Sequence, residues 1–188
     1  MKTREIRAKD LNAEQWIREK VKELQRTVGK GMAINALSGG VDSSVVTALG
    51  HRALGSRLKS CFIDNGLMRQ GEPQRVAALF KRIGIDIESV LARKAFFSAL
   101  REITDPEEKR EAITQTFYKK VFRDIVLNSG ARYLLQGTIL TDVDETVAGI
   151  KRQHNVFEQL GIDPQKAFGY RILEPLIHFR KDGVRKLG

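Results

Sequence analysis

Cysteine is almost absent from the sequence, because Cys61 stands alone among 188 residues. A single cysteine excludes an intrachain disulfide framework and suits a reducing compartment. No apolar run approaches the roughly 20 residues that a membrane-spanning helix needs. The first residues are charged throughout, unlike a secretory signal. We therefore expect a cytoplasmic protein without membrane spans.

Long basic runs are also missing, although the net charge is +10. A positive charge suits polyanionic partners such as nucleotides or RNA, but simple solubility explains it equally simply. The lysines and arginines are scattered, and no five of them are consecutive, so the sequence contains no nucleic-acid-binding arm. We expect nucleotides as ligands rather than nucleic acid.

Apolar periodicity predicts strands that alternate with helices. The predicted strands cover residues 32–37, 58–63, 85–91, 131–138 and 170–176, and the predicted helices cover 12–27, 42–54, 73–84, 94–103 and 106–128. This alternation predicts an α/β fold with an open parallel sheet and helices on both faces. Ligands of such sheets bind at the carboxyl ends of the strands. Three polar clusters lie at those ends, at residues 38–44, 64–72 and 136–145, and the last is expected to be a loop.

The stretch "SGGVDSS", residues 38–44, lies between a predicted strand and a predicted helix. Its two glycines let main-chain N–H groups approach a ligand closely, and the helix that follows presents further free N–H groups. Three serine hydroxyls add donors, so the stretch is typical of a phosphate-binding nest.

The chemistry of this loop differs from that of better-known phosphate loops. The Gly-Lys-Ser/Thr ending of a Walker A loop is absent, and so is the third glycine of a dinucleotide fingerprint. Asp42 would repel a bare phosphate, but Mg²⁺ binds both carboxylate and phosphate oxygens. The alternative is that Asp42 merely caps the helix.

"SGGVDSS" resembles the pyrophosphate loop of N-type ATP pyrophosphatases, the PP-loop superfamily. Further segments resemble, in order, parts of the ATP pyrophosphatase domain of the GMP synthetase family: "CFIDNGLMRQGE", "ITDPEEKREAI", "LLQGT", "DVDET", "IKRQHNV", "LEPL" and "FRKDGVRKLG". The resemblance covers roughly residues 32–188. It implies a Rossmann-like, adenine nucleotide alpha hydrolase-like fold for residues 31–188, preceded by an N-terminal helix within residues 1–30.

The resemblance also implies a reaction. ATP and Mg²⁺ would bind at the loop, xanthosine monophosphate (XMP) would be adenylylated with release of pyrophosphate, and ammonia would then displace AMP to give GMP. Such a carbon–nitrogen ligase subunit of purine biosynthesis would take its ammonia from a separate glutamine amidotransferase subunit. The C-terminal dimerisation domain typical of the family is absent from this chain, so a homodimer is only an open expectation.

Site residues follow from the resemblance by motif position. The family's pattern assigns ATP binding to Ser38, Gly39, Gly40, Val41, Asp42, Ser43, Ser44, Gly137, Thr138 and Lys151, catalysis to Asp42 and Lys151, and the metal to Asp42, Asp142 and Glu145. Ile63 is added to the ATP-binding residues because it ends the second predicted strand, where adenine and ribose usually lie in sheets of this type. Asp144 replaces an apolar residue of the family, and its role is open.

Departures from the family leave two alternatives. Gln153 stands where the family has a histidine, in a segment close to the acceptor nucleotide, so the acceptor could differ. One alternative is an adenylylating sulfurtransferase that acts on tRNA or a cofactor precursor. Such enzymes commonly use cysteine pairs, whereas Cys61 lies within an apolar strand and is expected to be a buried small hydrophobe. The other alternative is a non-catalytic ATP-binding module.

Overall fold

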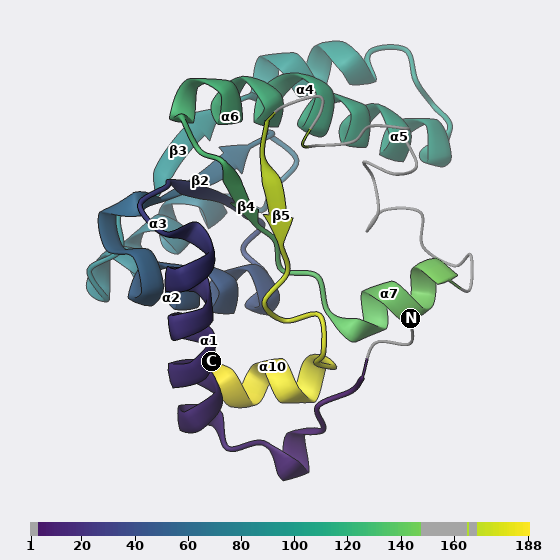
Figure 1. Ribbon diagram of the computed structural model, residues 1–188. Helices are drawn as coiled ribbons and strands as arrows, with labels where there is room; N and C mark the ends of the chain where they lie inside the picture. Colours follow the sequence, from purple (N-terminus) through teal and green to yellow (C-terminus); the bar gives the residue numbers. More distant parts are fainter. Residues whose placement is uncertain (1–3, 148–164, 166–168) are drawn as a thin grey trace.

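The computed structural model describes residues 4–147, 165 and 169–188 (Figure 1). The strands are β1 (Ala33–Leu37), β2 (Leu58–Asp64), β3 (Glu88–Leu91), β4 (Tyr133–Leu135) and β5 (Arg171–Leu173). The α-helices are α1 (Ala13–Val28), α2 (Val41–Leu54), α3 (Glu72–Arg82), α4 (Arg93–Leu100), α5 (Pro106–Thr116), α6 (Arg123–Ser129), α7 (Leu140–Val147) and α10 (Lys181–Leu187). Short helical turns are η1 (Ala8–Asp10), η2 (Gly55–Arg57) and the π-helical η3 (Phe117–Phe122).

The five strands form one parallel sheet in the order β3-β2-β1-β4-β5. The chain moves outward from β1 to β2 and β3, and then returns to the other side of β1 to form β4 and β5. The loops that follow β1 and β4 therefore diverge, and such a switch point is where open α/β sheets bind ligands. The predicted fold class is confirmed.

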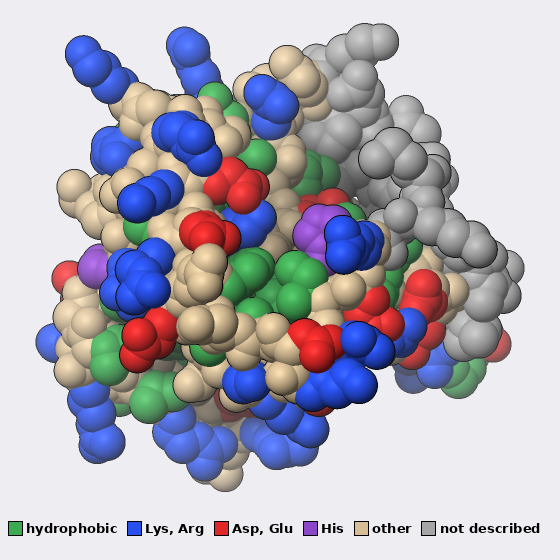
Figure 2. Space-filling model, turned by 60° about the horizontal axis from the view of Figure 1, so that its bottom comes forward, with side chains coloured by type: hydrophobic (Ala, Val, Ile, Leu, Met, Phe, Trp, Pro, Cys, Tyr) green, Lys and Arg blue, Asp and Glu red, His purple; other side chains and the backbone are tan. Residues whose placement is uncertain are grey.

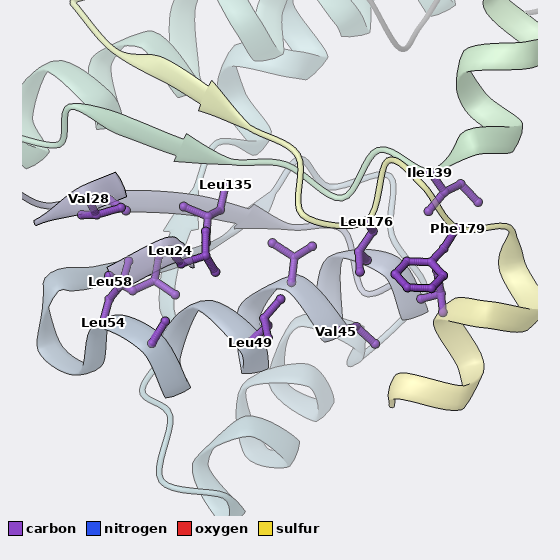
Figure 3. Packing of buried hydrophobic residues seen from close by; sticks show 14 of the residues in the cluster. Leu24, Val28, Val45, Leu49, Leu54, Leu58, Leu135, Ile139, Leu176 and Phe179 are labelled. Carbon is purple, nitrogen blue, oxygen red and sulfur yellow. The ribbon is translucent and has the colours of Figure 1, made fainter. Parts of the chain in front are cut away.

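Strand alternation divides the core between the two faces of the sheet. On one face, residues of α1, α2 and α10 pack against the sheet. Figure 3 shows Leu24 of α1, Leu49 of α2, Leu135 of β4 and Phe179, which precedes α10, in this cluster. On the other face, α4, η3 and α6 cover the sheet (Figure 1). Helix α1 thus shares the main core with α2, and its start is capped by Asn12, whose side chain accepts a hydrogen bond from Gln15 N.

Helix α2 lies unusually close to the sheet at Gly50. A Cβ atom at this position would lie 2.7 Å from Leu135 Cδ2 and 2.9 Å from Leu58 Cδ2. Glycine therefore lets α2 pack directly against the side chains of Leu58 in β2 and Leu135 in β4.

The local structure differs from expectation at two helices and in the form of a third. Residues 140–147 form helix α7 rather than a loop, and α10 was not expected at all. The helix expected over 106–128 is present as the continuous run α5–η3–α6, but it changes to a π segment in η3, where Phe117, Tyr118 and Phe122 contact one another edge-on or stacked. The ring contacts favour a π segment there because it brings three aromatic side chains together on one face.

The surface bears out the scattered charge pattern. In Figure 2 the lysine and arginine side chains are spread over the visible face, with acidic side chains between them. Within the described ranges, no helix is both long enough and apolar enough to cross a bilayer.

Candidate active site

The loop between β1 and α2 is held by hydrogen bonds of its own serine hydroxyl groups. Gly39 has a φ of 78°, a left-handed conformation that glycine adopts without strain. Ser43 Oγ and Ser44 Oγ donate to Gly40 O at 3.0 and 2.8 Å, and Ser43 Oγ accepts from Ser38 N at 3.3 Å. Three of the predicted ligand-binding residues therefore build the turn itself.

The first turn of α2 leaves its main-chain donors open. No side chain caps this helix at Gly40, and within the described part of the chain the N–H groups of Val41, Asp42 and Ser43 have no acceptor. These N–H groups and the positive end of the helix dipole converge at the carboxyl end of β1. This arrangement is suited to an anion, as the sequence predicts.

The end of β4 contacts this first turn directly. A Cβ atom on Gly137 would lie 3.1 Å from Ser43 N and 3.2 Å from Asp42 C, so the two predicted clusters meet at main-chain distance. Next to this contact, Thr138 Oγ1 is buried and has no hydrogen-bond partner among the described residues. An unsatisfied buried hydroxyl beside an open helix N-terminus is a polar group available to a ligand.

A lysine pairs with the carboxylate of the loop. Lys181, the first residue of α10, donates from Nζ to Asp42 Oδ2 at 2.6 Å. The other oxygen, Asp42 Oδ1, is buried and makes no hydrogen bond to any described residue. The family resemblance predicted that Lys151 supplies the positive charge of this site. Lys151 lies outside the described residues, and Lys181 was not predicted.

The remaining acidic residues lie on α7. Asp142 is buried, and its Oδ2 accepts a hydrogen bond from Ile139 N at 3.1 Å, at the start of that helix. Asp144, whose role the family pattern leaves open, accepts a hydrogen bond from Arg180 at 2.7 Å. Arg180 is the residue directly before Lys181. In the part of the chain that the structure describes, no three His, Cys, Asp or Glu side chains form a ready-made metal cage. The metal assignment of Asp42, Asp142 and Glu145 therefore stays a prediction.

The end of β2 is braced by a buried carboxylate. Asp64 Oδ1 accepts from Gly66 N at 2.9 Å, and Oδ2 accepts from Arg93 Nε and Nη2 at 3.0 and 2.8 Å. The hydrogen bonds from Arg93 hold the pKa of Asp64 below its ordinary value of 3.8, against the opposing effect of burial. The brace holds the start of the loop after β2, and Ile63, the residue before Asp64, is buried in the core cluster that contains Phe96 and Phe122.

This brace predicts a specific acid sensitivity. Because the pKa of Asp64 is lowered by folding, its ion pair stabilises the protein fully above about pH 4, and this stabilisation disappears as the pH falls through the lowered value. The difference in unfolding free energy between the wild type and Asp64→Asn should therefore be constant from pH 7 to 5 and shrink toward pH 3. Urea titrations at each pH measure it. Asp86→Asn, at an exposed position, is the control, and an Asp64→Asn difference that persists at pH 3 would contradict the prediction.

The lone cysteine lies away from the loop after β1. Cys61 is 2% exposed, and burial, followed by the charge of Glu88, raises the pKa of its thiol to about 12. It lines a cavity of about 650 Å³ on the face of the sheet covered by α4 and α6. A thiol with such a pKa is protonated at neutral pH and is a poor nucleophile, as the sequence predicts for a buried small hydrophobe.

Comparison with known proteins identifies the protein family that this chain resembles. Residues 11–140 match the family model described as NAD synthase. The chain is 45% identical over 175 residues to a protein named as one of the subunits of the glutamine-hydrolyzing GMP synthase of Pyrococcus furiosus, in a match that covers 93% of this chain and 54% of that protein. The chain spans about half the length of the curated relatives it matches. The resemblance to the GMP synthetase family is thereby confirmed.

Solved structures agree on the fold. The glutamine-dependent NAD+ synthetase from Acinetobacter baumannii, solved with ADP, has a TM-score of 0.68 at 14% identity, with 94% of this chain and 32% of that chain covered. The U34-tRNA thiolase NcsA from Methanococcus maripaludis, solved with its 4Fe–4S cluster, has a TM-score of 0.63 at 18% identity, with 93% and 63% covered. The family model spans well over half of the sequence, and the chain belongs to the NAD synthase family, a PP-loop family.

Proposed function

We propose that this chain is the ATP-activating part of a GMP synthase: it adenylylates XMP with release of pyrophosphate and lets ammonia convert the adenylylated base to GMP. The observation that carries the proposal is the open first turn of α2 with the Asp42–Lys181 pair beside it. The choice of XMP as acceptor is supported by the 45% identity to the GMP synthase relative from Pyrococcus furiosus.

The site suits a reaction in which charge develops on a leaving group. The oxygen at C2 of XMP would attack the α-phosphorus of ATP, the bond from that phosphorus to the bridging oxygen would break, and pyrophosphate would leave with the electron pair. The N–H groups of Val41, Asp42 and Ser43 would bind its oxygens, and Lys181 would neutralise part of its charge. Ammonia would then attack C2, AMP would leave, and the nitrogen would lose a proton.

The donor set fits a magnesium ion that is held mainly by the nucleotide. Mg²⁺ usually keeps several waters and takes one or two carboxylates together with phosphate oxygens. Asp42 Oδ1, buried and without a partner among the described residues, is such a carboxylate oxygen. When bound, the ion would offset phosphate charge. Asp142 and Glu145 would complete its surroundings, while Gly137 and Thr138 would contact the nucleotide, and Lys151 would approach the phosphates.

Partners and location belong to the same proposal. The relatives are named as one subunit of a glutamine-hydrolyzing enzyme, so a separate amidotransferase subunit would supply ammonia. A homodimer and a cytoplasmic location are proposed as well, the latter supported by the single reduced cysteine. The raised pKa of Cys61 disfavours a sulfur-transfer role for this residue.

The decisive experiment measures pyrophosphate release from ATP by the purified chain. With Mg²⁺ and ammonium present, release should depend on XMP and be accompanied by AMP and GMP in equal amounts. Inosine monophosphate, which lacks the oxygen at C2, is the matched control and should give no release. Pyrophosphate release that is independent of the nucleotide added, or none with XMP although ATP binds, would contradict the assignment of XMP.

A further inference from the structure

Three polar side chains are buried directly behind the loop between β1 and α2. Asn35 of β1 is 1% exposed, Thr47 of α2 is 0% exposed and Ser60 of β2 is 6% exposed. Their neighbours along the strands on the same face, including Leu37 and Leu58, are apolar core residues. Three buried polar groups in a position that apolar residues could fill call for an explanation.

The three side chains form one chain of hydrogen bonds with a fixed direction. Ser60 Oγ donates to Asn35 Oδ1 at 2.6 Å, and Asn35 Nδ2 donates to Thr47 Oγ1 at 2.5 Å. Because Thr47 Oγ1 accepts from the amide, its single proton is directed elsewhere, and it donates to Ser43 O at 2.8 Å. The chain therefore starts in β2 and ends on the main chain of Ser43, within the pyrophosphate loop.

The position of these contacts relative to the loop is informative. Asn35 lies three residues before Ser38, and Thr47 lies three residues after Ser44. Their hydrogen bond thus joins the two segments that enter and leave the loop, at a point where both segments are buried. Since the entry and exit are held together, the N–H groups of the first turn of α2 keep one spacing relative to the end of β1.

We propose that Asn35, Thr47 and Ser60 are positioning residues that set the geometry of the pyrophosphate loop, with Thr47 as the residue through which the network acts on Ser43. This inference rests on the proposed function, because it assumes that the loop binds the pyrophosphate end of ATP. None of the three side chains contacts the ligand itself. They pre-organise the nest, so their loss lowers ligand affinity rather than only the stability of the fold.

The test is the affinity of folded variants for inorganic pyrophosphate and for ATP, measured by calorimetric titration with Mg²⁺. Thr47→Val keeps the shape of the side chain but removes the hydroxyl, and both affinities should fall about tenfold, the equivalent of one lost hydrogen bond. Thr47→Ser retains the hydroxyl and should restore both affinities to within about twofold. Asn35→Asp, which cannot donate to Thr47, should weaken binding in the same direction as Thr47→Val.

Ser129→Ala is the matched control. Ser129 is also buried and hydrogen-bonded, donating to Val126 O at 2.7 Å, but it lies at the end of α6 on the other face of the sheet. Its loss should lower the melting temperature without changing either affinity. If Thr47→Val binds pyrophosphate as tightly as the wild type, the positioning role is overturned while the proposed function stands. If the wild type binds neither ligand, the proposed function fails, and the positioning role fails with it.

Discussion

Asp42→Asn is expected to lower XMP-dependent pyrophosphate release by at least about a hundredfold, the scale seen when one group that stabilises the transition state is removed. The two oxygens of this carboxylate have different surroundings. Oδ2 accepts a hydrogen bond from Lys181, and Oδ1 has no hydrogen-bond partner among the described residues and is available to a cation. An amide carries no charge and cannot replace it on Mg²⁺. Binding of pyrophosphate without Mg²⁺ should be retained or tightened, because Lys181 no longer has a carboxylate competitor.

The opposite responses of turnover and metal-free binding distinguish this prediction from simple damage to the loop. Stopped assays for pyrophosphate give the turnover, and titrations with chelator present give the affinity. Asp144→Asn is the control, since that carboxylate pairs with Arg180 on the neighbouring helix and should have a small effect. An Asp42→Asn variant that turns over normally would remove this residue from the mechanism.

Gly137→Ala is expected to affect stability and binding together. Its new Cβ would lie 3.1 to 3.3 Å from main-chain atoms of Asp42 and Ser43, which cannot rotate away as a side-chain tip can. The first turn of α2 must therefore shift, at a cost of about 1–3 kcal/mol in unfolding free energy. A shifted turn also misaligns the N–H donors, so ATP affinity should fall by at least about tenfold.

Gly50→Ala separates the two effects. Gly50 lies within α2 and is at least as crowded, with contacts of 2.7 and 2.9 Å, but these contacts are to the side chains of Leu135 in β4 and Leu58 in β2 rather than to main-chain atoms. Chemical unfolding should show a comparable loss of stability, whereas titration with ATP should show an affinity close to that of the wild type. Equal losses of affinity in both variants would mean that the contact at Gly137 has no special role.

Much of the fold was predictable because its strands are short apolar runs between helices of clear periodicity. The sequence predicted all five strands, although β3, β4 and β5 are shorter than expected. Helix α10 was missed because glycine normally disfavours a helix, yet a Cβ at Gly183 would lie 2.7 Å from Phe179 Cδ1, so the ring requires glycine there. Helix α7 was missed because its acidic residues obscure the helical spacing of its apolar residues in the sequence.

The candidate site was predictable in part. The polar clusters after β1 and β4 were both expected at the carboxyl ends of the strands, and in the structure Gly137 lies against the main chain of Asp42 and Ser43. Lys181 was not predicted, because one lysine among 33 basic residues carries no local pattern that marks it. Its role depends on the placement of α10 against α2, a tertiary contact that spacing along the chain cannot reveal. The buried network of Asn35, Thr47 and Ser60 was missed for the same reason.

The pairing of Lys181 with Asp42 joins residues that are 139 positions apart in the chain. At a synthesis rate of about 5–20 residues per second, Asp42 would therefore be added to the chain roughly 7 to 28 s before Lys181. Throughout that interval the carboxylate of Asp42 lacks this partner, so nucleotide binding cannot assist early folding through the complete site. Under the proposed function, ATP would become a stabilising ligand only after Lys181 has been made, so added ATP should slow the unfolding of the folded protein while leaving early folding steps unchanged.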